Sequence, residues 1–247
     1  MLPFLILLFL VLALGVLLCE WRRGGASIRP RELVFLCLSG AAMTLFAALR
    51  GESVGADYSM YEEYFLSVRE GGAAFVLSSA NEYRVEWGYS LLNYLVSLVS
   101  GDVRVFMAVV AVLIVGLTCV FIARHSPSWW LSVFVFLTFG SYLNSLCFLR
   151  QSIAIAIFLF AVPFLKEKRL LPYLGIVVLA ASFHKALFIM AALYFIAHIP
   201  VSWKSLTVYG VLTALVLIFS WPLCHFVTRC VYQYYATGDG LYYMEGG

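Results

Sequence analysis

Charged residues are scarce in this sequence: Asp, Glu, Lys and Arg make up 12% of the 247 residues, whereas 64% are hydrophobic. A chain with so little charge cannot cover a water-soluble globule, which excludes soluble enzymes, and no nucleic-acid partner is expected. The long apolar runs also lack the alternating polarity of a membrane-spanning barrel. The composition therefore predicts an all-α fold, namely a polytopic helical membrane protein.

Motifs of soluble catalytic sites are also missing. The sequence contains no glycine-rich phosphate loop, no His-Glu-x-x-His and no Gly-x-Ser-x-Gly motif, so nothing supports a soluble-type hydrolase or ATPase site. Its 6 cysteines lie singly in or beside apolar runs, which favours packing roles over zinc sites or disulfides. No inverted repeat is visible, although transporters usually show one.

The few charges predict how the chain crosses the membrane. Arginines cluster between residues 20 and 31, and residues 166–169 form a second basic cluster. The positive-inside rule places both clusters in the cytoplasm. Residues 51–86 form the only long polar stretch, which is acidic, so the loop of residues 50–104 is expected outside. We predict a single integral membrane domain over residues 1–247 with about seven spans.

The predicted spans follow the apolar runs. The N-terminal run lacks the basic start and the cleavage site of a signal peptide, so it is expected to remain as a span. Residues 170–199 form either one tilted helix or two short helices that meet at His184 and Lys185, and the second arrangement is favoured. The other spans are predicted at residues 3–19, 33–49, 105–123, 129–147, 152–165 and 205–226, the last with a kink at Pro222.

The outer loop is expected to carry two helices that lie on the membrane. Residues 87–100 are too short for a span, because a helix needs about 20 residues to cross a bilayer core. Leucine and valine side chains fall on one face of this segment, and Ser90 and Asn93 fall on the other. This pattern predicts an amphipathic helix in the interface. A second, short helix is expected to begin near Asp57.

Two arginines lie at the ends of predicted spans on the outer side. Arg150, followed by Gln151, stands at the junction of two apolar runs, and Arg50 follows the second predicted span. An arginine in such a place is costly in lipid and indicates a functional site with a partner. The two guanidinium groups could clamp a pyrophosphate through paired charge-assisted hydrogen bonds. The alternative is that each only reaches from a helix end to lipid headgroups.

Acidic and aromatic residues of the outer loop are candidate sugar contacts. Asp57 is either the N-cap of a helix or a ligand for sugar hydroxyls. The tyrosines that follow it, including Tyr58 and Tyr61, are either membrane-belt residues or platforms that stack on pyranose faces. Glu86, just before Trp87-Gly88-Tyr89, is either a helix cap or a general base or sugar-binding carboxylate.

His184 is the histidine most deeply embedded in apolar sequence. One interpretation is a hydrogen-bonded contact between helices. The other is an acid–base or phosphate-binding group, which its near-neutral titration range allows. If the adjacent Lys185 lies close, its charge lowers the pKa of His184 and favours the neutral form that can act as a base.

Five fragments carry a family resemblance. In chain order they are Arg50, then Gly55-Ala56-Asp57-Tyr58 with Tyr61, then Glu86-Trp87-Gly88-Tyr89, then Arg150-Gln151-Ser152-Ile153-Ala154, and last Phe183-His184-Lys185-Ala186-Leu187. In this order they resemble the EpsG family of exopolysaccharide polymerases, which look like relatives of the Wzy-type O-antigen and capsule polymerases. The resemblance covers roughly residues 30–200.

The resemblance implies a GT-C-like glycosyltransferase of the bacterial inner membrane, with its active site facing the periplasm or exterior. Such an enzyme joins oligosaccharide repeat units that are carried on undecaprenyl pyrophosphate. The expected catalytic residues are Glu86, Arg150 and His184. The expected substrate-binding residues are Arg50, Asp57, Tyr58, Tyr61, Tyr89, Gln151 and Lys185.

In the expected reaction a sugar hydroxyl of one lipid-linked repeat attacks the anomeric carbon of another, while Glu86 or His184 takes the proton. No cofactor or metal is expected, because pyrophosphate is the leaving group and arginines stabilise its charge. If a divalent ion did bind, Asp57 and Glu86 could hold it together. The rival function is a carrier that flips lipid-linked glycans without bond chemistry.

The expected partners are the lipid bilayer, undecaprenyl-pyrophosphate-linked oligosaccharides, a chain-length regulator and a flippase. Members of the family usually continue through several more spans, whereas this chain ends at Gly247. It is therefore expected to be a fragment or a short member.

Overall fold

The computed structural model describes residues 2–19, 30–51, 54–55, 57–82 and 85–231, and all regular secondary structure among them is helical. The chain divides into two compact units, unit 1 (Met1–Tyr194) and unit 2 (Phe195–Gly247). The predicted all-α class is confirmed. The prediction of one membrane domain with about seven spans stays a prediction.

Five helices share the first core of unit 1. Helices α2 and α5 run antiparallel, because Gly40 of α2 packs against Cys119 of α5 while Arg50, beyond the end of α2, reaches Met107 near the start of α5. Buried apolar residues from all five helices form one cluster. The helices are α1 (Leu2–Leu18), α2 (Pro30–Ala48), α5 (Val103–His125), α6 (Trp129–Thr138) and α7 (Ser141–Cys147).

The span predicted at residues 129–147 is broken. Helices α6 and α7 meet at an angle of 50°. The break falls at Gly140, whose φ of 83° lies in the left-handed region that glycine adopts without strain. The sequence analysis did not predict this bend, although Gly140 is followed by the polar residues Ser141, Asn144 and Ser145.

The second part of unit 1 packs against the other face of α5. The residues predicted at 152–165 lie in a run of helices, which begins at Leu149 and includes Arg150. A hairpin follows: Tyr173 donates a hydrogen bond to the carbonyl of Met190, and its ring contacts Tyr194. The favoured arrangement of two short helices over residues 170–199 therefore matches the structure. The elements are α8 (Leu149–Phe158), η1 (Leu159–Ala161), α9 (Val162–Lys166), α10 (Leu170–Ala181), η2 (Lys185–Ile189) and the part of α11 (Met190–Ala197) that precedes Phe195.

Two further helices precede α5. Helix α3 (Tyr58–Glu82) is longer than expected and is kinked at Gly72, where φ is 58°. Helix α4 (Trp87–Ser97) buries its polar face, since Ser90 and Asn93 are fully buried, whereas Leu91 and Leu95 are 41% and 51% exposed. Outward leucines suit a helix that lies against lipid, and the position of α4 in the membrane interface stays a prediction.

Unit 2 holds α12 (Trp203–Ile218) and α13 (Ser220–Val231). The axes of α12 and residues 220–226 differ by 75°. The predicted kink at Pro222 thus occurs three residues earlier, at Phe219. Pro222 itself lies in the first turn of α13, where a missing N–H leaves no helical hydrogen bond unmade.

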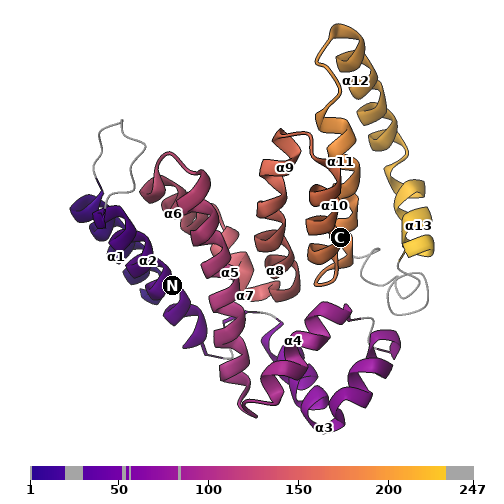
Figure 1. Ribbon diagram of the computed structural model, residues 1–247. Helices are drawn as coiled ribbons and strands as arrows, with labels where there is room; N and C mark the ends of the chain where they lie inside the picture. Colours follow the sequence, from indigo (N-terminus) through magenta and orange to yellow (C-terminus); the bar gives the residue numbers. More distant parts are fainter. Residues whose placement is uncertain (1, 20–29, 52–53, 56, 83–84, 232–247) are drawn as a thin grey trace. The chain divides into compact units, whose positions relative to one another are not determined.

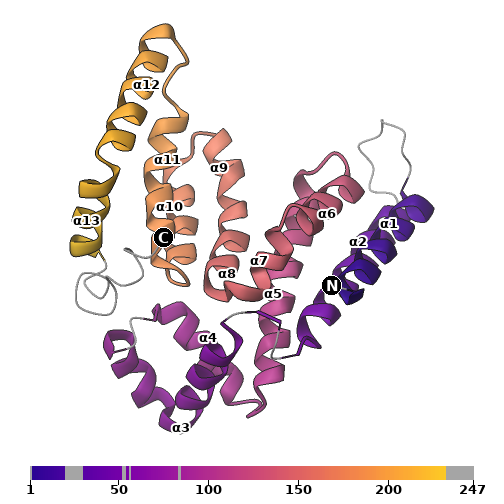
Figure 2. The ribbon, with the colours of Figure 1, turned by 180° about the vertical axis from the view of Figure 1, so that it is seen from behind.

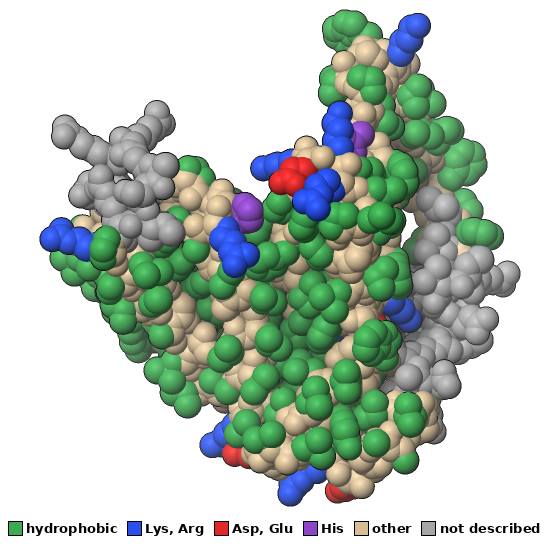
Figure 3. Space-filling model, viewed as in Figure 1, with side chains coloured by type: hydrophobic (Ala, Val, Ile, Leu, Met, Phe, Trp, Pro, Cys, Tyr) green, Lys and Arg blue, Asp and Glu red, His purple; other side chains and the backbone are tan. Residues whose placement is uncertain are grey.

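Charged side chains gather toward two ends of unit 1 (Figure 3), whose helices can be followed in Figures 1 and 2. The basic end holds the α5–α6 and α9–α10 turns, which lie close together because Phe121 and Phe160 are in ring contact. The site end holds α3, α4 and the beginnings of α5 and α8. Figure 3 shows hydrophobic side chains over the band between them. The basic end carries Arg124, Lys166, Lys168 and Arg169, and the site end carries Glu62, Glu63, Glu70 and Asp102.

The described helices fit a membrane protein. By length and composition, 3 of them could cross a membrane, or 5 if each bent pair counts as one span, and shorter apolar helices accompany them. The candidate spans α5 and α8–α9 both run from the site end to the basic end. The two ends of unit 1 therefore lie at opposite ends of these candidate spans.

Candidate active site

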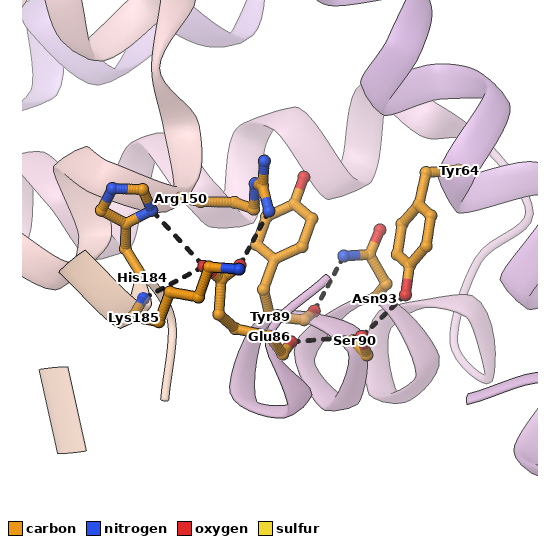
Figure 4. A network of polar contacts seen from close by, with 8 residues as sticks. All are labelled: Tyr64, Glu86, Tyr89, Ser90, Asn93, Arg150, His184 and Lys185. Atoms are coloured by element: carbon orange, nitrogen blue, oxygen red, sulfur yellow. Dashed lines mark hydrogen bonds and ion pairs between the residues drawn. The ribbon is translucent and has the colours of Figure 1, made fainter. Parts of the chain in front are cut away.

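Glu86 is the centre of a polar network at the site end of unit 1 (Figure 4). Its Oε2 accepts a hydrogen bond from Arg150 Nη1 at 2.7 Å, and its Oε1 accepts one from the backbone N–H of Lys185 at 3.0 Å. His184 Nδ1 lies 3.5 Å from the same Oε1. The Glu86 side chain is only 7% exposed, whereas those of Arg150 and His184 are 28% and 25% exposed. The three predicted catalytic residues are thus neighbours.

Breaks between helices place the partners of Glu86. Phe148, with ψ of 66°, separates α7 from α8, so Arg150 stands in the first turn of α8. His184 is extended, with φ of −154°, and ends the turn between α10 and η2. The N–H groups at a helix start have no partner within the helix. The Glu86 carboxylate therefore caps η2 through Lys185 while it pairs with Arg150.

Gly88 allows this contact between distant segments. Its N–H donates to the carbonyl of Ser182 at 2.8 Å, which docks the start of α4 against the end of α10. A Cβ atom at position 88 would lie 2.7 Å from that carbonyl oxygen, closer than real Cβ contacts come. A glycine is therefore required two residues after Glu86 for the carboxylate to reach the turn at His184.

The network keeps Glu86 ionised. Burial by itself would raise the pKa of Glu86, but the facing His184, the Lys185 N–H and the charge of Arg150 together lower it to about 2. Burial raises the pKa of Tyr61, which Arg150 opposes because it lies beside that hydroxyl. At neutral pH the site therefore holds a carboxylate, a guanidinium and a protonated phenol next to the His184 imidazole.

Tyrosines form a packed wall behind the network. Tyr58, Tyr61 and Tyr89 are each 5% exposed or less, and the rings of Tyr61 and Tyr89 are 6.0 Å apart. Tyr64 shares a hydrogen bond of 2.7 Å with Ser90. These predicted sugar platforms thus pack against one another in this structure, and their role in substrate binding stays a prediction.

Two buried polar atoms in this wall have no hydrogen-bond partner within the described part of the chain. They are the hydroxyl of Tyr89 and Oδ1 of Asn93. The Tyr89 hydroxyl points toward the guanidinium of Arg150 (Figure 4). An unpaired buried hydroxyl is unusual in native proteins and is a common feature of functional sites.

Arg50 lies in a second cluster, between α2, α5 and α7. Its Nη2 is 3.5 Å from the Met107 sulfur, and its guanidinium carbon is 5.8 Å from the centre of the Tyr58 ring. Its Nε is buried and has no hydrogen-bond partner among the described residues. Burial lowers the pKa of Arg50, and nearby phenols and a thiol oppose this. A small cavity beside it is lined by Tyr142, Ser145 and apolar side chains of α5.

The remaining predicted site residues lie at the edge of these clusters. Asp57 directly precedes α3, and its carbonyl accepts from the N–H of Tyr61, as expected of a residue at the N-cap position. Gln151 is exposed on α8 and makes none of the contacts described for Glu86. Their roles in substrate binding stay predictions.

Metal binding was considered for Asp57 and Glu86. In the part of the chain that the structure describes, no group of 3 or more His, Cys, Asp or Glu side chains could hold a metal ion. The groups suited to a ligand there are cationic: Arg150, with further N–H donors beyond the one Glu86 accepts, and Arg50. Both favour an anion, and a guanidinium matches phosphate oxygens well.

Sequence reasoning did not find two features of the site. One is the docking of Gly88 on Ser182, for which the only signal was a glycine within the fragment Glu86-Trp87-Gly88-Tyr89. The other is the inward polar face of α4, because a helical pattern shows which residues share a face but not what that face contacts.

Comparison with known proteins gives one family. A sequence model of the EpsG family matches residues 33–246. No curated protein and no solved structure matches the chain. The matched region includes both arginine clusters and the Glu86 network.

Proposed function

Because the chain belongs to the EpsG family, a family of membrane polysaccharide polymerases, we propose that it joins oligosaccharide repeat units carried on undecaprenyl pyrophosphate. The product is an exopolysaccharide, capsule or O-antigen chain. The network of Glu86, Arg150 and His184 is the observation that carries this proposal, since it combines an anion-binding group with an acid–base group.

Arg150 stabilises the pyrophosphate leaving group. In the reaction the bond between the anomeric carbon and the pyrophosphate oxygen breaks, and the electron pair goes to that oxygen. A guanidinium with donors to spare stabilises the negative charge that develops, an effect worth several kcal/mol in a site with little water. Arg150 is buried enough for this effect and exposed enough, at 28%, to be reached.

His184 serves as the base, and Glu86 positions it. The attacking sugar hydroxyl forms the new bond to the anomeric carbon and gives its proton to the imidazole. A carboxylate whose pKa is about 2 takes up protons poorly near neutral pH, so Glu86 is the weaker of the two candidate bases. Its position beside Nδ1 instead fixes the ring, and the other ring nitrogen points away from Glu86 (Figure 4).

The active site faces the outside of the bacterial inner membrane. Arg124, Lys166, Lys168 and Arg169 share the basic end of unit 1, and the positive-inside rule assigns that end to the cytoplasm. The Glu86 network lies at the opposite end. Lipid-linked repeat units on the outer leaflet would reach it there.

The reaction can be tested with purified protein in lipid nanodiscs. The substrate is an oligosaccharide on undecaprenyl pyrophosphate, and the products are sized on a gel. Wild-type protein should give a ladder of products and release undecaprenyl pyrophosphate. Movement of the substrate across a vesicle bilayer with no change in its size would instead support the carrier and overturn the polymerase.

Two variants test the assigned roles. Arg150→Ala and His184→Ala should each reduce polymer formation at least about 100-fold, which corresponds to roughly 3 kcal/mol of transition-state stabilisation. Matched controls are Arg69→Ala, an exposed arginine that donates to the Gly101 carbonyl, and His125→Ala at the end of α5. Near-normal turnover in His184→Ala would show that His184 only packs.

A further inference from the structure

Tyr61 lies on α3 beside Arg150 and is almost completely buried. It is 4% exposed, and its ring centre lies 6.0 Å from that of Tyr89. Tyr89 packs in turn edge-on against Phe106 of α5. A tyrosine enclosed in this way offers no open ring face on which a sugar could stack. Its hydroxyl is therefore the group whose role has to be explained.

Two hydrogen-bond donors at the start of α8 face the Tyr61 hydroxyl. One is the backbone N–H of Leu149, and the other is the side chain of Arg150. Leu149 is the first residue of α8, where a backbone N–H has no partner within the helix, and the preceding Phe148 has no side-chain acceptor to cap it. A hydroxyl oxygen can accept two hydrogen bonds. Tyr61 therefore holds both the backbone from which Arg150 departs and the guanidinium itself.

The guanidinium of Arg150 is held by two acceptors from different elements. Glu86, just before α4, accepts from Nη1 at 2.7 Å, and Tyr61 belongs to α3. A planar guanidinium with one hydrogen bond can still turn about that bond, whereas a second acceptor from another direction fixes its plane. The Arg150 side chain is 28% exposed, so the N–H groups that these acceptors leave unused can face a ligand.

The second acceptor is neutral, which matters for an arginine that has to meet an anion. Burial raises the pKa of Tyr61, so its phenol stays protonated near pH 7. Glu86 already balances the charge of Arg150, and a second carboxylate in the place of Tyr61 would make the group negative and repel a phosphate. A phenol orients the guanidinium without adding that charge.

We propose that Tyr61 is a positioning residue, whose hydroxyl holds the Arg150 guanidinium in the orientation that the leaving group requires. The inference rests on the proposed function, in which Arg150 stabilises the leaving pyrophosphate. Tyr61 itself touches Arg150 and not the substrate. This role differs from the sugar platform expected from the sequence.

The first test is a comparison of rates in the polymerisation assay. Tyr61→Phe keeps the ring and removes the hydroxyl, so we expect kcat to fall about 10-fold while KM changes less than about twofold. The matched control is Tyr173→Phe, which removes another buried hydroxyl, one that donates to the Met190 carbonyl near the start of α10. It should turn over like wild type. A normal kcat in Tyr61→Phe, or a loss that lies entirely in KM, would overturn the proposal.

The second test asks through which arginine Tyr61 acts, because Tyr61 also lies near Arg50. In the Arg150→Ala background, Tyr61→Phe should reduce the remaining rate less than about twofold, since the group that it positions is gone. In the Arg50→Met background the full loss of about 10-fold should remain. A loss of about 10-fold in both backgrounds would indicate a merely structural role, and a loss that disappears only with Arg50→Met would place the action at Arg50. Either result overturns the proposal.

The contact between Tyr61 and Arg150 can also be tested without activity. Tyr61→Phe should lower the unfolding temperature more in wild type than in Arg150→Met, where one of the two donors to the hydroxyl is already missing. An equal fall in both proteins overturns the contact, whether or not polymer forms. If the falls differ but wild type makes no polymer, the proposed function fails and the contact remains.

Discussion

Arg50 and Arg150 are the same residue type at the same end of unit 1, yet their surroundings differ. Arg150 donates to the Glu86 carboxylate at 2.7 Å, whereas among the described residues Arg50 contacts the Met107 sulfur, at 3.5 Å, and the Tyr58 ring. A paired buried charge is compensated within the fold, and an unpaired one destabilises the fold until an anion binds. Arg150 thus belongs to the architecture as well as the site, whereas Arg50 has no carboxylate partner among the described residues.

The largest difference between the two clusters is expected when one charged residue is removed from each. Glu86→Ala leaves Arg150 as an uncompensated, largely buried charge, so we expect a loss of about 3 kcal/mol in unfolding free energy. Arg50→Met removes an unpaired charge with little change of volume, so stability should stay equal or rise. Thermal unfolding of both variants in the same detergent measures the contrast. Equal destabilisation of the two would show that Arg50 also has an internal partner.

The ionisation of Glu86 gives a matching pH dependence. Its pKa is lowered from 4.5 to about 2 in the folded protein, so the ionised carboxylate stabilises the fold above about pH 4.5. That contribution is lost progressively as the pH falls from 4.5 toward 2. Unfolding temperatures should therefore fall more steeply over this range in wild type than in Glu86→Gln. Arg50→Met should follow wild type, because Arg50 does not titrate there.

Two glycines, one beside each arginine cluster, allow the clusters to be disturbed separately through packing instead of charge. Gly88→Ala puts a Cβ against the Ser182 carbonyl and should pull Glu86 away from His184 and Lys185. Gly55→Ala meets the Leu146 carbonyl and forces a residue with a φ of 108° out of its preferred range, close to Tyr58 and Arg50. Each should cost roughly 2 kcal/mol of stability.

The two glycine variants should differ in which arginine cluster they disturb. With farnesyl diphosphate as a binding probe, Gly88→Ala should weaken anion binding at Arg150, and Gly55→Ala should weaken anion binding at Arg50. Gly175→Ala is the control, because a Cβ there meets nothing within 4 Å. Identical losses at both sites in both glycine variants would show that the clusters act as one.

Much of the fold was predictable from the sequence because lipid imposes simple rules. Apolar runs and basic clusters predicted most helices, and the polar His184-Lys185 pair marked the break between α10 and η2. Bends were harder. Gly140 breaks the run at residues 129–147 through backbone conformation, which leaves no trace in hydropathy.

The sequence indicated which residues belong to the candidate site but not which of them contact one another. The predicted topology brings Arg50, Glu86, Arg150 and His184 to one end, and in the structure Glu86 contacts both Arg150 and His184 there. Which arginine meets which carboxylate depends on contacts between segments, such as that of Gly88 with Ser182, 94 positions apart in sequence. A single sequence carries no signal for such pairs. The burial of Tyr58, Tyr61 and Tyr89 was hidden for the same reason.

The smallest expected effect concerns the tyrosine wall on the Arg150 side. Tyr89→Phe removes a buried hydroxyl that has no partner among the described residues, so we expect stability to rise by about 1 kcal/mol. Tyr64→Phe is the matched control, because it breaks the 2.7 Å hydrogen bond with Ser90 and should lower stability by a similar amount. Both variants keep the ring packing, so unfolding temperatures in one detergent report the hydroxyl alone.

Measuring the activity of Tyr89→Phe as well as its stability tests the role of the Tyr89 hydroxyl. A more stable Tyr89→Phe protein with a lower kcat/KM would show that the hydroxyl is kept for a substrate at Arg150, since a packing role cannot improve stability and impair turnover together. A less stable Tyr89→Phe protein would instead reveal an internal partner such as a buried water. In that case every polar group around Arg150 would have a hydrogen-bond partner within the protein. The contrast with Arg50, whose Nε has no partner among the described residues, would then be larger.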